Sequence, residues 1–253
     1  MMYTKPTNDM RKYLLIISAL FISCQNGSNK LYKLEIDTAS KRLTKLTAQK
    51  EIELLEYFAD STAVGKPGKN KIELSHFRNT DSSYVAIRFY AKSKDNKWLL
   101  RQEFNFLKDD ISGCFTELSD FNNDGFKDLT YKSAIAARGA NDVRNLFIYN
   151  KSQNQLTYMK NSEDYPNMLY NKKLDCIDAF LVHGGSTTVF LKIERDSLKE
   201  FASVDIADKI NIQIVDTNGN RKYLVRDMKS NFEPYTRFKN FRPLEESSID
   251  YYR

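Results

Sequence analysis

The pattern that most constrains this chain is a series of short apolar segments, separated by polar turns at intervals of roughly 8–12 residues. Residues 94–97 and 150–154 are two such turns, and the Asn218-Gly219 pair suits a type I′ hairpin turn. The segments with strand character are 83–90, 98–106, 146–149, 155–159, 174–182, 188–194, 199–205, 210–215 and 221–225. This spacing predicts a mainly β fold over residues 69–230, an antiparallel meander organised as a sandwich or in a propeller-like way.

One segment ahead of these strands is typical of a helix. In residues 47–60, the apolar side chains of Ile52, Leu55 and Phe58 recur at a spacing of three. This periodicity places one face of a helix against a core. We therefore expect one N-terminal helix, within a helical segment over residues 41–68.

The beginning of the chain has the organisation of an export signal. Arg11 and Lys12 precede an uninterrupted apolar run over residues 13–22. A run of about ten residues is too short to cross a bilayer, which needs roughly 20, but it suits the apolar region of a signal peptide. Met10 directly precedes the basic pair, so we expect translation to start there and residues 1–23 to be a signal peptide.

The residues that follow this run indicate lipidation. Ser23 followed by Cys24 resembles a bacterial lipoprotein cleavage box, in which the Cys thiol receives the lipid. We expect Cys24 to anchor the chain, residues 24–40 to form the anchor and a tether, and the protein to face the periplasm in the cell envelope, with the outer membrane as its expected location. The alternative is a plain secretory signal followed by a chance Cys.

Residues 120–128 carry oxygen side chains at positions one, three, five and nine. Calcium takes six to eight oxygen ligands, and Gly125 permits the sharp turn that wraps such a loop around one ion. The expected ligands are the side chains of Asp120, Asn122, Asp124 and Asp128 and the backbone carbonyl of Phe126. An EF-hand is excluded because position twelve is Tyr131 rather than Glu. The pattern predicts a structural Ca²⁺ site, and the alternative is an ordinary turn rich in Asp and Asn.

This loop resembles the calcium loops of FG-GAP and VCBS-type repeats, which occur in integrin-like propeller blades. The similarity extends over residues 84–205, through segments 136–139, 145–156, 165–177 and 182–190. Their order resembles that of a group of small bacterial periplasmic proteins and lipoproteins with a propeller-like, lysozyme-inhibitor-like β fold. Some members of that group are immunity proteins against secreted peptidoglycan-cleaving effectors.

The resemblance also implies a partner-binding loop. In such inhibitors a protruding loop rich in Gly and Ser enters the cleft of the hydrolase. The matching residues are His183, Gly184, Gly185, Ser186 and Thr187. The alternative is a plain hairpin loop, and no basic side chain of the inhibitory kind stands in this segment.

Several classes of function are disfavoured by composition and motifs. The 39 Lys and Arg residues are interleaved with 33 Asp and Glu residues, so we expect no nucleic-acid partner. The sequence has no C-x-x-C, P-loop or dinucleotide fingerprint, and Ser186 does not stand in a nucleophile elbow. Cys114 and Cys176 either pair in an oxidising compartment or remain buried thiols.

Together these features predict a lipid-anchored envelope protein without enzymatic activity. Its expected work is protein binding, and the most specific form is inhibition of, or immunity against, a peptidoglycan hydrolase. Two alternatives stay open: a calcium-dependent envelope hydrolase that acts on glycans, and a structural lipoprotein. Residues 231–253, which are rich in Phe and Tyr, form either an edge strand packed on the body or a loose tail.

Overall fold

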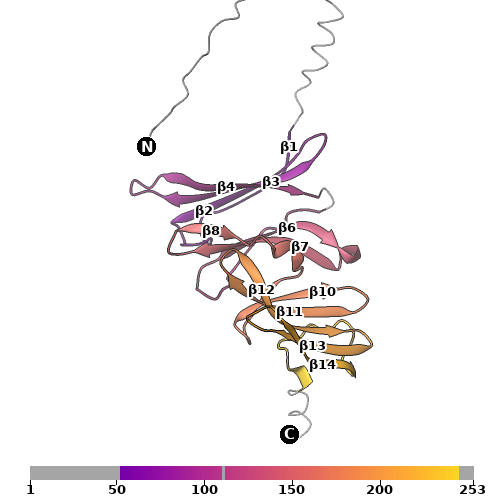
Figure 1. Cartoon of the computed structure of the whole chain (residues 1–253). Helices are drawn as coiled ribbons and strands as arrows, with labels where there is room; N and C mark the ends of the chain where they lie inside the picture. Colours follow the sequence, from indigo (N-terminus) through magenta and orange to yellow (C-terminus); the bar gives the residue numbers. More distant parts are fainter. Residues whose placement is uncertain (1–51, 110–111, 245–253) are drawn as a thin grey trace, which may run out of the picture. The chain divides into compact units, whose positions relative to one another are not determined.

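The computed structural model describes residues 52–109 and 112–244. These residues form fourteen β-strands and two short 3₁₀ helices (Figure 1). In chain order they are β1 (Glu53–Asp60), β2 (Asn70–Arg78), β3 (Ser83–Lys92), β4 (Trp98–Lys108), β5 (Glu117–Ser119), β6 (Asp128–Ala136), η1 (Ala137–Gly139), β7 (Asn141–Asn150), β8 (Gln155–Tyr158), η2 (Ser162–Asp164), β9 (Leu169–Asn171), β10 (Cys176–Val182), β11 (Ser186–Glu194), β12 (Ser197–Ile206), β13 (Lys209–Val215) and β14 (Arg221–Lys229).

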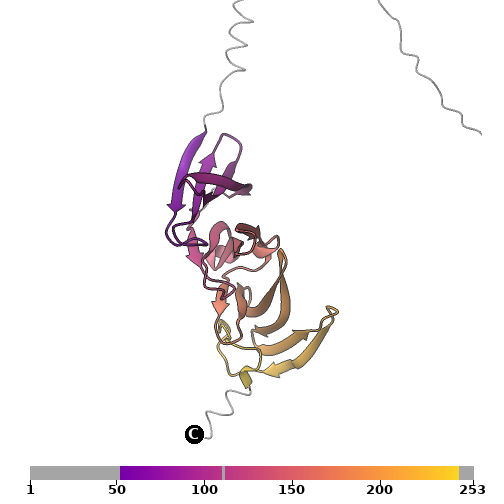
Figure 2. The ribbon, with the colours of Figure 1, turned by 90° about the vertical axis from the view of Figure 1, so that its left-hand side faces the viewer.

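The strands form three antiparallel sheets, and within each sheet neighbouring strands follow one another along the chain. The orders are β1-β2-β3-β4, β5-β6-β7-β8 and β14-β13-β12-β11-β10-β9. Figure 2 shows the three sheets succeeding one another. The predicted antiparallel meander is therefore confirmed. Within the described ranges no sheet closes on itself, so the chain does not form a closed propeller.

The middle sheet is buried on both of its faces. Along β7, Phe147 and Tyr149 belong to a first core cluster shared with the β1–β4 sheet, whereas Leu146 and Ile148 belong to a second cluster shared with the β9–β14 sheet. Successive side chains of a strand point to opposite faces, so a strand between two sheets is apolar at every position. The unbroken apolar run of residues 146–149 has this explanation.

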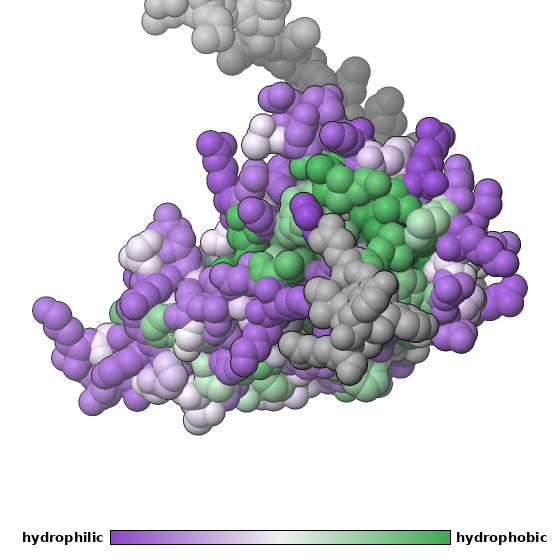
Figure 3. Space-filling view, turned by 90° about the horizontal axis from the view of Figure 1, so that it is seen from below, coloured by the Kyte–Doolittle hydropathy of each residue, from purple (hydrophilic) through white to green (hydrophobic). Residues whose placement is uncertain are grey.

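Towards the end of the described chain the β-structure becomes exposed. β14 is an edge strand, and its Tyr223, Leu224 and Met228 are each about 40% exposed. On the face seen in Figure 3, hydrophobic residues gather into one area amid mostly hydrophilic surroundings.

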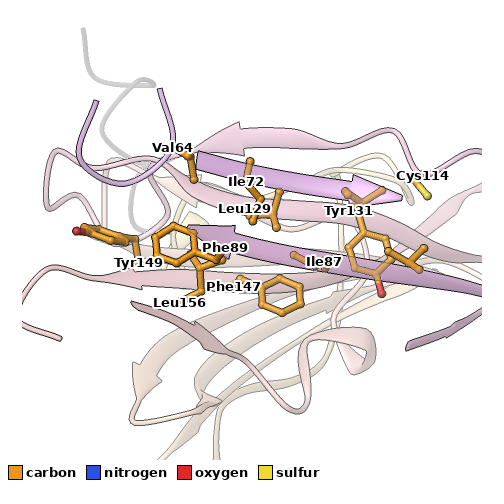
Figure 4. Close-up of a cluster of buried hydrophobic side chains, with 12 residues drawn as sticks. Val64, Ile72, Ile87, Phe89, Cys114, Leu129, Tyr131, Phe147, Tyr149 and Leu156 are labelled. Carbon is orange, nitrogen blue, oxygen red and sulfur yellow. The ribbon is translucent and has the colours of Figure 1, made fainter. Parts of the chain in front are cut away.

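The first core cluster is rich in aromatic rings. Phe147 lies at the centre of the ring contacts, with centroids 5.2 Å from Phe104 and 5.1 Å from Tyr158. Cys114 stands at one end of this cluster and Val64 and Tyr149 at the other (Figure 4). Offset and edge-to-face contacts of this kind stabilise a core beyond the apolar area that they bury.

The predicted helix over residues 47–60 is wrong where the structure describes it. Residues 53–60 form β1, which pairs with β2 along its length, and residues 41–51 lie outside the described residues. Phe58 packs into the first core cluster, while Leu54 and Tyr57 are exposed. Pairing with β2 satisfies the backbone of this segment and overrides its helical periodicity. The β-structure therefore begins at Glu53, ahead of the predicted boundary at residue 69.

The C-terminal aromatic segment packs on the body as far as the structure describes it. Phe238 is buried in a third core cluster with strands β10–β13, and Phe232 and Phe241 pack against it. The Arg237 guanidinium pairs with the largely buried Asp178, with Nε 2.7 Å from Oδ1. Residues 231–244 are thus part of the folded domain, although they form no strand.

The predicted signal peptide, Cys24 and the tether lie outside the described residues. Among the residues that are described, no helix has the length and apolar character required to span a membrane.

Candidate calcium loop and partner surface

The candidate calcium loop connects β5 to β6, and its last residue, Asp128, is the first residue of β6. The loop is held in shape by its own side chains. The Asp120 carboxylate accepts backbone N–H groups of Asp124 at 3.2 Å and Gly125 at 2.9 Å. Asn123 and Gly125 have positive φ values of 57° and 84°, which turns the backbone sharply twice.

The Asp124 carboxylate completes the local network. Its Oδ1 accepts the Phe126 N–H at 2.9 Å, and its Oδ2 lies 3.1 Å from the donating Nδ2 of Asn122. Asp120, Asn122 and Asp124 therefore belong to one turn, with their oxygens committed to fixing its conformation. A loop ordered by its own Asp and Asn side chains needs little rearrangement to bind an ion.

Asp128 differs from the other acidic residues because it is fully buried. Its Oδ2 accepts the N–H of Phe121 and its Oδ1 accepts the N–H of Tyr149 on β7, both at 2.8 Å. Burial raises the pKa of this carboxyl group to about 7, opposed by these two hydrogen bonds and assisted by the charges of Asp124 and Asp120. The carboxylates of the loop are thus close enough to repel one another. A cation among them relieves that repulsion.

The loop is anchored in two different cores. Phe121, at its start, is buried in the second core cluster, and Phe126 packs on the first, with its ring 5.5 Å from that of Tyr149. The residue after Phe126, Lys127, accepts the Gly65 N–H at 3.0 Å through its carbonyl, which ties the β1–β2 connection to the loop. The loop therefore contributes side chains to both interfaces of the middle sheet, the one with the β1–β4 sheet and the one with the β9–β14 sheet.

The predicted partner loop is divided by the structure. His183 and Gly184 form an exposed turn, whereas Gly185 and Ser186 are buried. A Cβ on Gly185 would lie 2.2 Å from the Ile206 carbonyl, and the Ser186 hydroxyl donates to the Pro234 carbonyl at 2.9 Å. The resemblance to a protruding Gly/Ser loop therefore fails for these two residues, because they are packed against β12 and the C-terminal segment.

The exposed part of this loop borders a groove. The Thr187 hydroxyl donates to Asp205 at 2.7 Å and lies 3.0 Å from Nε2 of His183. Thr187 and Asp205 line a groove of about 390 Å³ across β11, β12, β13 and β14. Within it, the Arg221 guanidinium holds Glu200 through two hydrogen bonds of 2.7 Å.

Cys114 and Cys176 are free thiols. Cys114 belongs to the first core cluster and Cys176 to the third, so the pairing considered from the sequence does not form. Burial and the charge of Glu56 raise the pKa of the Cys114 thiol to about 12, and burial and the charge of Asp178 raise that of Cys176 to about 11. Both behave as protonated core thiols in the absence of a metal.

Two groups of residues that sequence reasoning missed are brought together by strand pairing. One is the Glu200–Arg221 pair of the groove, which lies on β12 and β14. The other consists of Glu56, His76 and Cys114, from three separate segments. No local spacing connects the members of either group, so only the register of the sheets could have indicated them.

No protein-family model and no curated protein matches the chain. A solved structure described as "Structure of a Xanthomonas Type IV Secretion System related protein" is similar over 70% of this chain and 97% of that chain, with a TM-score of 0.42 and 12% sequence identity. A similarity at this level carries no argument about fold or function.

Proposed function

We propose that this chain is a lipid-anchored protein of the cell envelope whose β domain holds a structural Ca²⁺ ion and binds a protein partner. The most specific form of the proposal is an inhibitor or immunity protein against a peptidoglycan hydrolase. The observation that carries the calcium part is the loop of residues 120–128, in which Asp120, Asn122 and Asp124 form one hydrogen-bonded turn and Asp128 is buried at its end. Calcium prefers an oxygen set of this kind.

A structural role for the ion is supported by the position of the loop. Phe121 and Phe126 pack into two different core clusters, so ordering residues 120–128, which connect β5 to β6, would stabilise the packing of the three sheets. The loop contains no His or Ser that could act as a nucleophile or base beside the ion, and its one Lys, Lys127, is exposed. The ion therefore serves the fold, and the partner is bound elsewhere.

Binding rather than catalysis is supported by the groove beside His183. The Glu200 and Asp205 carboxylates that line it are each occupied by a donor, the guanidinium of Arg221 in one case and the Thr187 hydroxyl in the other. Glycosidases place two carboxyl groups on either side of the scissile bond, one as acid and the other as base or nucleophile. A groove of paired charges next to an exposed turn is better suited to recognise a protein surface.

The partner surface can be tested with one substitution at the exposed turn. A Cβ on Gly184 meets no atom within 4 Å, so Gly184→Lys changes the surface without disturbing the packing. The matched control is Gln153→Lys, in the exposed β7–β8 turn of another sheet. With the full chain as bait in calcium, we expect capture of a peptidoglycan hydrolase from the cell's own envelope extract, at least tenfold weaker for Gly184→Lys and unchanged for Gln153→Lys.

The captured hydrolase, or a lysozyme, is then assayed for peptidoglycan cleavage with and without the chain. Inhibition by the wild type supports the specific form of the proposal. Recovery of no hydrolase, together with no inhibition of lysozyme, excludes it. Cleavage of peptidoglycan by the chain alone would instead favour the envelope hydrolase.

The lipid anchor has a separate test. Cys24→Ser removes the thiol that receives the lipid, so the variant should move from the membrane fraction to the soluble fraction. Mass spectrometry of the wild type should find lipid on Cys24 and no residue before it. A wild-type chain that is soluble and carries residues 1–23 would contradict the anchor but leave the calcium site untouched.

A further inference from the structure

A second group of potential metal ligands lies far from the calcium loop, where β1, β2 and the β4–β5 connection meet. One ligand atom each of Glu56, His76 and Cys114 lies within 4.8 Å of the other two. His76 and Cys114 are buried, and the Glu56 side chain is 38% exposed. His76 lies 20 positions after Glu56 along the chain, and Cys114 lies 58 positions after it. The three residues therefore come together only when the chain is folded.

Glu56 is aimed at this site by an irregularity in β1. Glu56 and His76 are direct cross-strand partners, and a register shift between Leu54 and Glu56 breaks the alternation just before them. A β-bulge of this kind redirects the side chain that follows it. The redirected carboxylate accepts the backbone N–H of Cys114 at both oxygens, at 2.9 and 3.1 Å.

The hydrogen bonds of His76 leave one ring nitrogen facing the carboxylate. Ser83 Oγ donates to the Phe77 carbonyl at 3.3 Å and lies 2.6 Å from Nε2 of His76. Of the two tautomers that these distances allow, the one in which Ser83 donates to Phe77 places the N–H of His76 on Nε2. In the neutral ring Nδ1 then presents a lone pair to Glu56 Oε1, 3.5 Å away. A proton on Nδ1 or a metal ion between the two atoms satisfies both of them.

Metal-binding histidines commonly have this arrangement, with one nitrogen on the metal and the other donating to a fixed oxygen. A separation of 3.5 Å between Nδ1 and Oε1 also suits two ligands at about 2.0–2.1 Å on a tetrahedral ion. The thiol of Cys114 supplies the third ligand. Sulfur and imidazole ligands exclude calcium and favour a borderline ion such as Zn²⁺.

The Glu56 end of the site borders a cavity that is open to solvent. Glu56 lines a cavity of about 450 Å³ together with Gly113, Phe115 and Thr116. A Cβ on Gly113 would lie 2.9 Å from Glu56 Oε1, so a larger residue at this position would collide with the carboxylate. The segment that carries Cys114 is held by Lys108, whose buried ammonium group donates to the Ser112 carbonyl at 2.6 Å.

We propose that Glu56, His76 and Cys114 form a binding site for one Zn²⁺ ion, with the fourth position open to the cavity. The ion clamps the edge strand β1 and the β4–β5 connection onto β2. This site is independent of the calcium loop and of the proposed partner surface.

The test uses the full chain carrying Cys24→Ser, stripped of metal by a chelator and returned to calcium. Co²⁺ is the probe, because a thiolate bound to it produces a charge-transfer absorption that Zn²⁺ abolishes by displacement. We expect one equivalent of Co²⁺ with this absorption, full displacement by Zn²⁺, and the same result for the matched control Cys176→Ser. Cys114→Ser should lose the absorption.

Glu56→Gln provides a second variant with the shape of the native side chain, and its amide oxygen can still accept the Cys114 N–H. We expect it to weaken Co²⁺ binding at least tenfold, with an unchanged circular dichroism spectrum. If Cys114→Ser fails to fold, the Co²⁺ affinity of Glu56→Gln tests the proposal in its place. No thiolate absorption in the wild type, absorption that persists in Cys114→Ser, or unchanged affinity in Glu56→Gln would overturn the proposal.

Discussion

The loop between β5 and β6 takes all its candidate ligands from nine consecutive residues, and every ligand atom is an oxygen. The cluster of Glu56, His76 and Cys114 takes one oxygen, one nitrogen and one sulfur from three segments. Both sites contact the first core cluster. The loop contacts it near Tyr149, and the Glu56–His76–Cys114 site contacts it at Cys114. Tyr149 and Cys114 lie at opposite ends of the cluster (Figure 4). Because the donor atoms differ so much, we expect the two sites to select different ions, and each can be changed without changing the ligands of the other.

The difference extends to what holds each site together. The loop is ordered by hydrogen bonds within its own nine residues, and its buried carboxylate, Asp128, also accepts the N–H of Tyr149 on β7. The second site depends on the pairing of β1 with β2 and on the position of residues 112–114. We therefore expect an ion in the loop to stabilise the junction of the sheets, and an ion in the second site to stabilise an edge.

The largest effect is expected from Asp128→Ala. The substitution leaves the buried N–H groups of Phe121 and Tyr149 without an acceptor, which should lower the free energy of unfolding by about 2–5 kcal/mol. Asp128→Asn retains one acceptor oxygen and should lose roughly half as much. Urea unfolding of the full chain in chelator measures both. Equal stability of Asp128→Ala and the wild type would contradict the role of Asp128 as a buried anchor.

The second-largest change in the free energy of unfolding is expected when calcium is added to the wild type. An ion that binds only the folded chain adds about 2.7 kcal/mol when present at 100 times its dissociation constant. Asp124→Ala removes one exposed ligand, so it should abolish this gain while changing the stability in chelator much less than Asp128→Ala. Thermal melts with calcium and with chelator compare the two. A calcium-dependent shift that survives in Asp124→Ala would place the ion elsewhere.

The pH dependence of the calcium-free chain should have a definite sign. Because the pKa of Asp128 is raised to about 7, the folded state holds its proton more tightly than the unfolded state does. The contribution of this group to stability is therefore present below about pH 4 and lost as the pH rises through 7.

Urea unfolding in chelator at about pH 5 and pH 8 should show the wild type losing about 1–3 kcal/mol relative to Asp128→Asn. Excess calcium should remove that difference. A relative stability that is independent of pH in chelator would refute the assignment of the raised pKa to Asp128.

Each site should be insensitive to loss of the other. Glu56→Gln is expected to keep the calcium-dependent thermal shift of the wild type, and Asp124→Ala to keep its Co²⁺ absorption, because the two sites share no ligand. Parallel titrations of the two variants check this. A loss of both ions in either variant would show that the sites are one cooperative unit.

The smallest change is expected from oxidation. Cys114 and Cys176 lie in different core clusters, so treatment with a mild oxidant should form no bond between them and should leave the melting temperature unchanged. Alkylation in denaturant followed by mass spectrometry should find both thiols free. A disulfide between them would remove a ligand from the second site and break the contrast between the two sites.

The same contrast explains what could be predicted from the sequence. Alternation and turn residues identify most strands and the antiparallel meander, and the calcium loop is visible because its residues are contiguous. The strand β1 was not predictable in this way, since Ile52, Leu55 and Phe58 fit a helix until β2 pairs beside them. The burial of Gly185 and Ser186 and the meeting of Glu56 with Cys114 depend on contacts between distant segments, which no local pattern records.

Direct calcium binding is the measurement closest to the central claim. In a calorimetric titration of the metal-stripped full chain, the wild type should bind one Ca²⁺ ion, and Asp124→Ala should bind none or bind at least tenfold more weakly. Absence of binding by the wild type, or equal binding by Asp124→Ala, would contradict a calcium site at residues 120–128.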